Sequence, residues 1–81
     1  MYEIISFLKR SKNRLKILKS VKDKPKIPTE IGSELNIHKS AVSRGLKELE
    51  EKDLIKCLTP DQKKGRLYHI TEKGKKVLKK L

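Results

Sequence analysis

The sequence predicts a small α+β domain that is mainly helical, with a three-helix core, an antiparallel hairpin of two or three strands, and a flanking helix at each end. The chain has 81 residues, roughly half the usual length of a domain, which excludes two independent cores. Leu, Ile, Val and Phe make up 23 of these residues, more than the ~20% typical of disordered chains. The spacing of apolar residues is helical up to residue 53 and turns toward alternation between residues 54 and 71.

The first 22 residues have the apolar spacing of a helix. Apolar side chains recur one turn apart, at Ile4, Leu8, Leu15 and Leu18. Either Ser11 or Asn13 is a suitable N-cap for a second helix. We therefore expect one helix at 2–10 and another at 12–22, with a single continuous helix as the alternative.

Two prolines, Pro25 and Pro28, interrupt the helical pattern and predict a short extended segment. Thr29 then has the chemistry of an N-cap, and a helix of about two turns is expected after it. Residues 36–39 form a tight turn, and Ser40 is the expected N-cap of the next helix, which ends near Asp53.

Residues 54–71 predict a β-hairpin. The strands are expected at 54–58 and 66–71, and the turn between them is punctuated by Pro60 and Gly65. A final helix follows over 72–81, opened by Thr71 or Glu72.

The charge of the chain points to a polyanionic partner, nucleic acid first and an acidic membrane surface second. Lys and Arg number 22 against 10 Asp and Glu, a net charge of +12. Residues 1–28 and 56–81 each carry a net of +7, whereas residues 29–55 carry −2. Much of the positive charge is therefore expected to act through non-specific attraction, outside the helix-turn-helix pattern at 29–52.

Two short helices joined by a tight turn form a helix-turn-helix, whose second helix is held rigidly for the major groove of DNA. On a helix over 40–52, one face is apolar and the opposite face carries short polar and basic side chains. The residues expected to reach base edges or nearby phosphates are Lys39, Ser40, Ser43, Arg44 and Lys47. Arg44 can bind guanine through two hydrogen bonds, and Ser40 can bind phosphate near the helix start.

The hairpin tip over 59–66 carries a second set of candidate DNA contacts. Lys63, Lys64 and Arg66 flank Gly65 there, and they are expected to contact the DNA backbone or minor groove. Lys26 and Thr29, near the start of the first helix of the helix-turn-helix pair, are candidate phosphate contacts.

Several classes of protein are excluded because the sequence lacks the residues that they require. Two histidines and the single Cys57 have no acidic partner at a catalytic or metal-binding spacing, so we expect no enzyme, no metal site and no cofactor. No apolar run approaches the ~18 residues of a membrane span. A lone cysteine also cannot form an internal disulfide, which favours the cytoplasm.

Residues 29–46 (TEIGSELNIHKSAVSRGL) resemble the helix-turn-helix of winged-helix transcriptional regulators in the bacterial and archaeal MarR- and ArsR-like group. The continuation KELEEKDLIKC is similar to the passage into the first wing strand, and the segment from Asp61 to Gly74 resembles the wing and the helix after it. The resemblance covers residues 12–75. We therefore expect a single winged helix-turn-helix domain over 1–81, with its core at about 12–75, the wing at 54–71 and the last helix at 72–81.

This resemblance implies regulation of transcription by a dimer on a pseudo-palindromic site in double-stranded DNA. A homodimer through the terminal helices is also suggested by apolar residues that a small core has difficulty burying: Ile4, Phe7, Leu8, Val77, Leu78 and Leu81. The chain departs from the group in two ways. It lacks the paired cysteines of metal-sensing ArsR-like repressors, and its terminal helices are shorter than those of MarR-like proteins, so no small-molecule effector is evident.

The leading expectation is thus a sequence-specific DNA-binding protein. The alternative is a winged helix that binds a protein, or that binds nucleic acid as an architectural module without sequence preference, because a fold by itself does not determine function.

Overall fold

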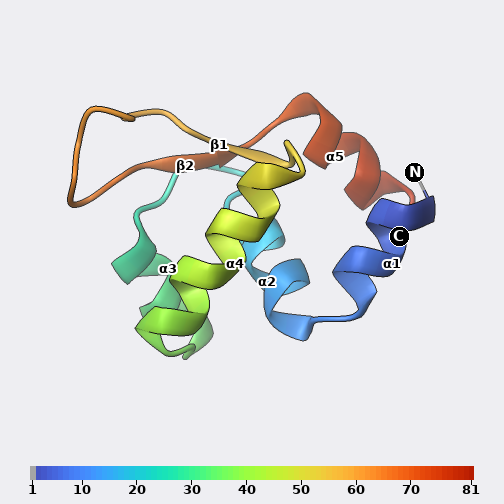
Figure 1. Cartoon of the computed structure of the whole chain (residues 1–81), viewed down its shortest axis with the longest axis horizontal. Helices are drawn as coiled ribbons and strands as arrows, with labels where there is room; N and C mark the ends of the chain where they lie inside the picture. Colours follow the sequence, from blue (N-terminus) through green and yellow to red (C-terminus); the bar gives the residue numbers. More distant parts are fainter. Residues whose placement is uncertain (1) are drawn as a thin grey trace.

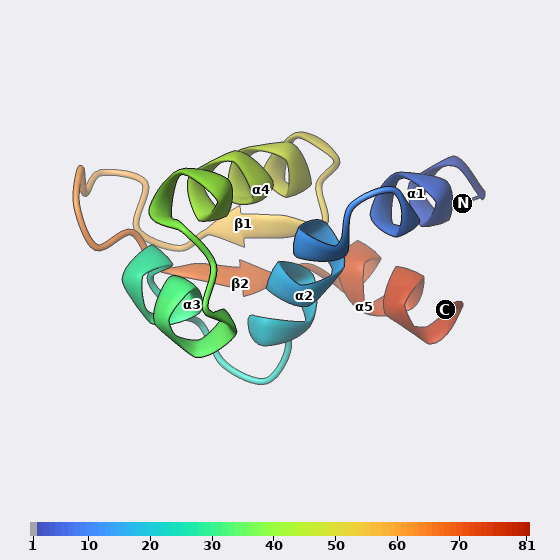
Figure 2. The same ribbon diagram turned by 90° about the horizontal axis from the view of Figure 1, so that it is seen from below.

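A computed structural model describes residues 2–81 as five helices and two strands (Figure 1). In chain order these are α1 (Tyr2–Lys9), α2 (Lys12–Ser20), α3 (Pro28–Leu35), α4 (Lys39–Glu51), β1 (Ile55–Cys57), β2 (Tyr68–Ile70) and α5 (Glu72–Lys79). The loop between β1 and β2 extends away from the body at one end, and both chain ends lie at the other (Figures 1 and 2). No helix in residues 2–81 is long and apolar enough to cross a membrane.

The N-terminal segment forms two helices rather than one, as the favoured interpretation of the sequence predicts. Ser11 separates them with an extended backbone (φ −138°, ψ 115°), and its hydroxyl accepts a hydrogen bond from the amide of Arg14 at 3.4 Å. A side chain that satisfies a free amide at a helix start favours this break over continuation of α1.

The prediction that Thr29 caps α3 is wrong by two residues. The helix already includes Pro28, whose fixed φ suits the first helical position. The N-cap is Ile27, and the Glu30 carboxylate accepts a hydrogen bond from its backbone amide at 3.0 Å. Glu30, and not Thr29, is therefore the side chain that accepts a hydrogen bond from a backbone amide at the start of α3. Thr29 lies exposed in the first turn.

The turn between α3 and α4 is set by two residues with special backbone or side-chain roles. Asn36 ends α3 in the left-handed conformation (φ 54°, ψ 48°), which asparagine tolerates better than most residues. His38, and not the expected Ser40, is the N-cap of α4: its Nδ1 accepts from the amide of Ser40 at 3.2 Å and lies 2.9 Å from the Ser40 hydroxyl. A ring nitrogen two residues earlier reaches the amide that the Ser40 hydroxyl cannot.

The end of α4 directs the chain into the sheet. Asp53 adopts a left-handed conformation (φ 61°), and the amide of the buried Leu54 returns to the carbonyl of Leu49 at 3.0 Å. This arrangement satisfies a carbonyl of the last turn and reverses the chain toward β1.

The hairpin is shorter than predicted. β1 and β2 are antiparallel, with Ile55 opposite Ile70, Lys56 opposite His69 and Cys57 opposite Tyr68. Lys26 forms an isolated antiparallel bridge with Tyr68 of β2, in which the two residues exchange backbone hydrogen bonds of 3.0 and 2.9 Å. The segment between the prolines is therefore extended, as expected, and joins the edge of the sheet.

The hairpin is followed at once by α5, which Thr71 caps. Its hydroxyl accepts from the amide of Gly74 at 3.0 Å and donates to the carbonyl of Asp53 at 2.7 Å, so one side chain links the start of α5 to the end of α4. At Gly74 a β-carbon would collide with the carbonyl oxygen of Leu54, so only glycine lets α5 pack this closely on the turn before β1.

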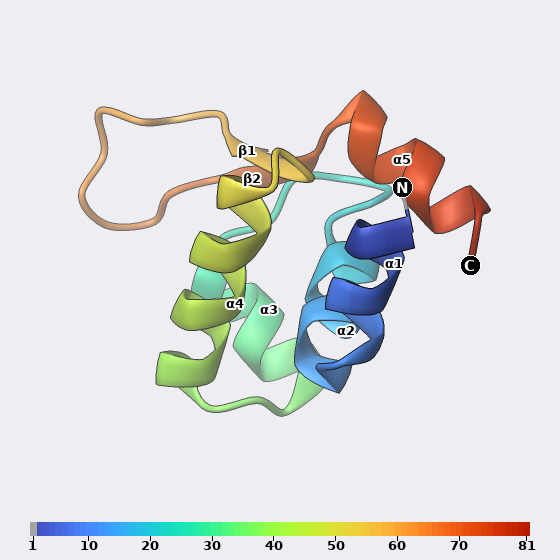
Figure 3. The same ribbon diagram turned by 45° about the vertical axis from the view of Figure 1, so that its right-hand side comes forward.

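One hydrophobic core joins the helices and the sheet, and α4 packs against both α2 and α3 (Figure 3). Its buried members are Leu8, Ile17, Leu18, Val21, Ile31, Val42, Leu46, Leu49, Leu54, Ile55, Tyr68, Ile70 and Val77. Leu8 and Val77, expected at a dimer interface, are therefore part of the monomer core. Ile4, Phe7 and Leu78 are half-buried, and Leu81 is 43% exposed.

Candidate nucleic-acid interface

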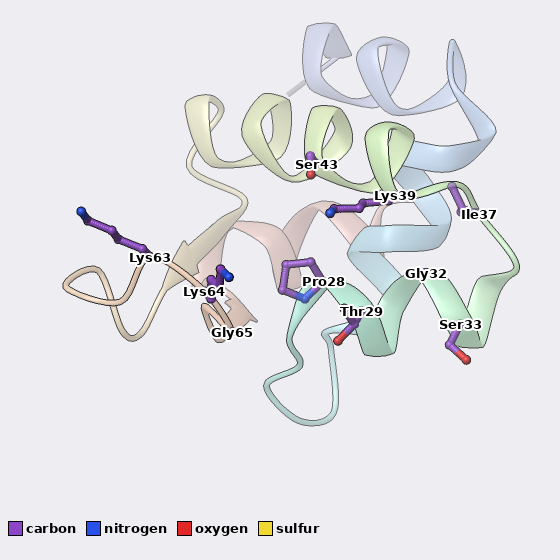
Figure 4. Close-up of a pocket in the computed structure, with 10 residues that line it drawn as sticks. All are labelled: Pro28, Thr29, Gly32, Ser33, Ile37, Lys39, Ser43, Lys63, Lys64 and Gly65. Carbon is purple, nitrogen blue, oxygen red and sulfur yellow. The ribbon is translucent and has the colours of Figure 1, made fainter.

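A groove of about 690 Å³ lies between the first turns of α3, the N-terminal half of α4 and the wing loop, residues 58–67 (Figure 4). Its lining residues are Pro28, Thr29, Gly32, Ser33, Ile37, Lys39, Ser43, Lys63, Lys64 and Gly65. Five residues proposed from the sequence, separated by up to 35 positions along the chain, therefore meet around one groove: Thr29, Lys39, Ser43, Lys63 and Lys64.

The outer face of α4 carries the residues expected to read bases. Ser40, Ser43, Arg44 and Lys47 are all exposed. The opposite face of the helix is buried in the core through Val42, Leu46 and Leu49. Because that buried face holds the helix in place, the four exposed side chains project from a rigid support.

The acidic second half of α4 is organised differently from the sequence-based expectation. The helical spacing of the sequence is compatible with pairing within α4, of Lys47 with Glu51 and of Glu48 with Lys52. Glu48 instead pairs with Arg14 of α2, through Nε–Oε1 and Nη2–Oε2 distances of 3.2 and 2.9 Å. Neither of these two pairs is among the ion pairs found in residues 2–81. A two-point contact with a guanidinium fork is stronger than the contact a flexible lysine offers.

The two partners shift each other's ionisation in the direction expected for an ion pair. The hydrogen bond from Arg14 lowers the pKa of the Glu48 carboxyl, and the same bond raises the pKa of the Arg14 guanidinium. The nearby positive charge of Arg44 lowers the pKa of Glu48 further, as the smallest of the causes. Both groups are thus held in their charged forms.

The wing loop presents two of its three basic side chains freely. Lys63 and Lys64 are exposed beside Gly65, whose φ of +66° favours glycine. Arg66 is turned back onto the loop: its Nε donates to the carbonyl of Gln62 at 2.7 Å, and its Nη2 lies 3.4 Å from the carbonyl of Pro60. Arg66 therefore braces the tip that displays the two lysines.

Lys26 stands apart from the other candidates. Its side chain is only 11% exposed, and its Nζ lies 2.7 Å from the Glu34 carboxylate. The charge of Lys26 is thereby compensated within the protein, next to the bridge that Lys26 forms with β2.

Arg14 is not among the candidate functional residues that the sequence suggested. The missed signal is its spacing, because Arg14 precedes the buried Ile17, Leu18 and Val21 by three, four and seven positions. That is the periodicity of the core-facing side of a helix. A charged residue in such a position requires a partner.

Residues 2–81 bring together no group of three or more His, Cys, Asp or Glu side chains suited to a metal ion. Cys57 is half-buried on β1, and Tyr68, on β2, is buried in the core.

Comparisons with known proteins place this geometry in context. Residues 2–81 match the HVO_A0261 N-terminal domain family. The chain is 35% identical over 75 residues to the Bacillus subtilis (strain 168) protein YdgG, an uncharacterized HTH-type transcriptional regulator, covering 88% of this chain and 49% of YdgG.

Two solved structures share the fold. Transcriptional regulator Tm0710 from Thermotoga maritima superposes with a TM-score of 0.77 at 28% identity, over 96% of this chain and 56% of that one. The C30AH42A mutant of Lactococcus lactis ZitR superposes with a TM-score of 0.76 at 28% identity, over 86% and 49%. The predicted winged-helix fold is thereby confirmed, and the chain spans about half the length of these relatives.

Proposed function

We propose that this chain, which belongs to the HVO_A0261 N-terminal domain family and has the winged-helix fold of transcriptional regulators, is a sequence-specific double-stranded DNA-binding domain. It acts without enzymatic chemistry or a cofactor. The observation that carries the proposal is the groove that Lys39 and Ser43 of α4 line together with Lys63 and Lys64 of the wing loop.

In the proposed complex, the N-terminal half of α4 enters the major groove. Arg44 donates two hydrogen bonds to a guanine, and Lys47 reaches a guanine or a phosphate. Ser40 and Ser43 are short enough for the helix to approach the base edges closely. Glu50 and Glu51 lie exposed in the second half of the same helix, so that half points away from the phosphates.

Thr29 and the wing contribute contacts to the DNA backbone. Lys63 and Lys64 bind phosphates beside the groove or reach the adjacent minor groove. Thr29, exposed at the start of α3, contributes a neutral phosphate contact. Lys26 and Arg66 have protein partners already, so we assign them supporting roles: Lys26 holds the segment before α3, and Arg66 shapes the tip.

The proposed regulator works in the cytoplasm as a homodimer on a pseudo-palindromic site, because a two-fold protein matches two half-sites. The terminal helices lie at the end opposite the wing loop (Figures 1 and 2). There Ile4, Phe7, Leu78 and Leu81 remain half-buried or exposed. These four residues are the proposed dimer contact, and a monomer by light scattering at high micromolar concentration would contradict it.

The function is tested by selecting binding sites from random duplexes at about 150 mM salt, where non-specific attraction is weakened. An enriched motif centred on a guanine supports a sequence-specific regulator, and an inverted repeat supports the dimer. Binding without enrichment would identify an architectural module. The absence of binding would favour a protein-interaction module.

A further inference from the structure

We infer that Arg14, outside the DNA-contacting surface, is a positioning residue for recognition: it holds the Glu48 carboxylate and so leaves Arg44 free to bind DNA. The inference rests on the proposed function, since it assigns a role to Arg14 only if Arg44 contacts DNA. It follows from the positions of three charged side chains on α2 and α4.

All three nitrogens of the Arg14 guanidinium are engaged. Nε and Nη2 donate to the two oxygens of Glu48 at 3.2 and 2.9 Å, and Nη1 donates to the carbonyl of Phe7 at 2.9 Å. The guanidinium carbon also lies 4.1 Å from the centre of the Phe7 ring. The side chains of Arg14 and Glu48 are only 19% and 32% exposed, so the pair is held in one geometry.

Arg44 lies one helical turn before Glu48, at the spacing where opposite charges on a helix attract each other. The two are close enough for the charge of Arg44 to lower the pKa of the Glu48 carboxyl. Yet Arg44 forms no ion pair within residues 2–81 and is exposed. The partner that Glu48 takes is Arg14, on the neighbouring helix.

Removing Arg14 would leave the Glu48 carboxylate with a cation one helical turn away on either side, Arg44 before it and Lys52 after it. Pairing with Glu48 would turn Arg44 along the helix axis, toward the acidic half of α4 and away from a base edge. Even if Glu48 remained unpaired, its negative charge would no longer be compensated by Arg14 and would repel the DNA phosphates. Either outcome weakens binding, and the first also relaxes the sequence preference.

Arg14 has a structural role as well, because it links α1 and α2 to α4. A variant that lacks it can therefore bind weakly for two reasons: a captured Arg44, or a loosened helix. The two differ in what happens when the Glu48 charge is removed too. Neutral Glu48→Gln cannot capture Arg44, but it does not restore the link between the helices.

The test measures the affinity of the 81-residue chain for its selected duplex with Arg14→Met, Glu48→Gln and the double variant. Methionine keeps an apolar side chain against the Phe7 ring. We expect Arg14→Met to lower affinity about tenfold, comparable to the loss of one base contact. Glu48→Gln should bind about as well as the parent chain, and the double variant should recover most of the lost affinity. In an Arg44→Ala background, Arg14→Met should have little further effect.

Two results would overturn the inference: a folded Arg14→Met variant with undiminished affinity, or a double variant as weak as Arg14→Met. Circular dichroism establishes that each variant is folded at the assay temperature. Should Arg14→Met not fold, Arg14→Lys replaces it, since a lysine keeps the charge but loses the fork; its defect should again be relieved by Glu48→Gln. If the parent chain selects no site, the proposed function itself is wrong. If it does so and depends on Arg44 but not on Arg14, only the inference is wrong.

Discussion

The helix α4 and the wing loop both carry basic side chains to the same groove, but they stand on very different supports. One face of α4 is buried through Val42, Leu46 and Leu49, and Arg14 fixes its middle turn. Residues 59–66 of the wing loop are nearly all exposed, and a β-carbon at Gly65 would meet no atom within 4 Å.

Because their supports differ, we expect the two regions to have different roles in DNA binding. Bidentate recognition of a base edge requires a side chain whose Cα is held in a fixed position, and the packed helix α4 provides such positions. Attraction to phosphates is tolerant of position, and a loop that presents two lysines is sufficient for it. We therefore expect changes in α4 to affect the fold and the sequence preference, and changes in the wing loop to affect the salt dependence.

The largest expected effect is on stability. Leu49→Ala removes a fully buried side chain of α4 and should lower the free energy of unfolding by about 3 kcal/mol. Leu58→Ala, at the base of the wing loop where the side chain is 40% exposed, should cost less than about 1 kcal/mol. Urea denaturation followed by circular dichroism measures both. Equal losses would mean that the wing loop is packed as firmly as α4.

Next in size is the loss of a base contact. Arg44→Ala should weaken binding to the selected duplex by about 1–3 kcal/mol and relax the preference at one base pair. Competition between the selected site and its single-base variants measures this. The matched control is Glu50→Ala, an exposed change in the second half of the same helix, which should leave the preference unaltered. A uniform loss on every duplex would mean that Arg44 binds phosphate.

A smaller effect is expected from the wing loop. Lys63→Ala and Lys64→Ala should each reduce the slope of log affinity against log salt by about one unit, with the sequence preference intact. Lys79→Ala, which removes the same charge from an exposed site on α5 at the opposite end, is the control and should leave the slope nearly unchanged. An unaltered slope in the wing variants would remove the loop from the interface.

The smallest effect is the pH dependence of the pair that holds α4. Because Arg14 lowers the pKa of Glu48 in the folded chain, the ionised carboxylate stabilises the fold above the unfolded pKa, and this contribution is lost as the pH falls through the folded pKa. Glu48→Gln should therefore lower the midpoint of thermal unfolding slightly at pH 7. The gap to the parent chain should shrink as the pH falls from about 5 toward 2. A gap that stays constant with pH would show that the charge of Glu48 contributes nothing.

Much of the fold was predictable because local patterns and tertiary packing agree. Ser11 breaks the N-terminal segment as its capping chemistry predicts, and Thr71 opens the last helix. The order of helices, turn and hairpin follows from apolar spacing, which reports the face that each element buries. Errors occurred at helix starts, where Glu30 and His38, and not Thr29 and Ser40, accept hydrogen bonds from backbone amides. Several nearby side chains can serve such an amide, and only the backbone geometry selects one.

The candidate site was predictable as a set of residues but not as an arrangement. The sequence alone determined which side chains lie on the outer face of α4, because a helix with one apolar face must expose the other. Only the tertiary structure decided that Lys63 and Lys64 lie across a groove from Lys39 and Ser43, and that Glu48 pairs with Arg14, 34 positions away, and not along its own helix. Periodicity describes one element at a time, whereas charges on different elements meet only where packing brings those elements together.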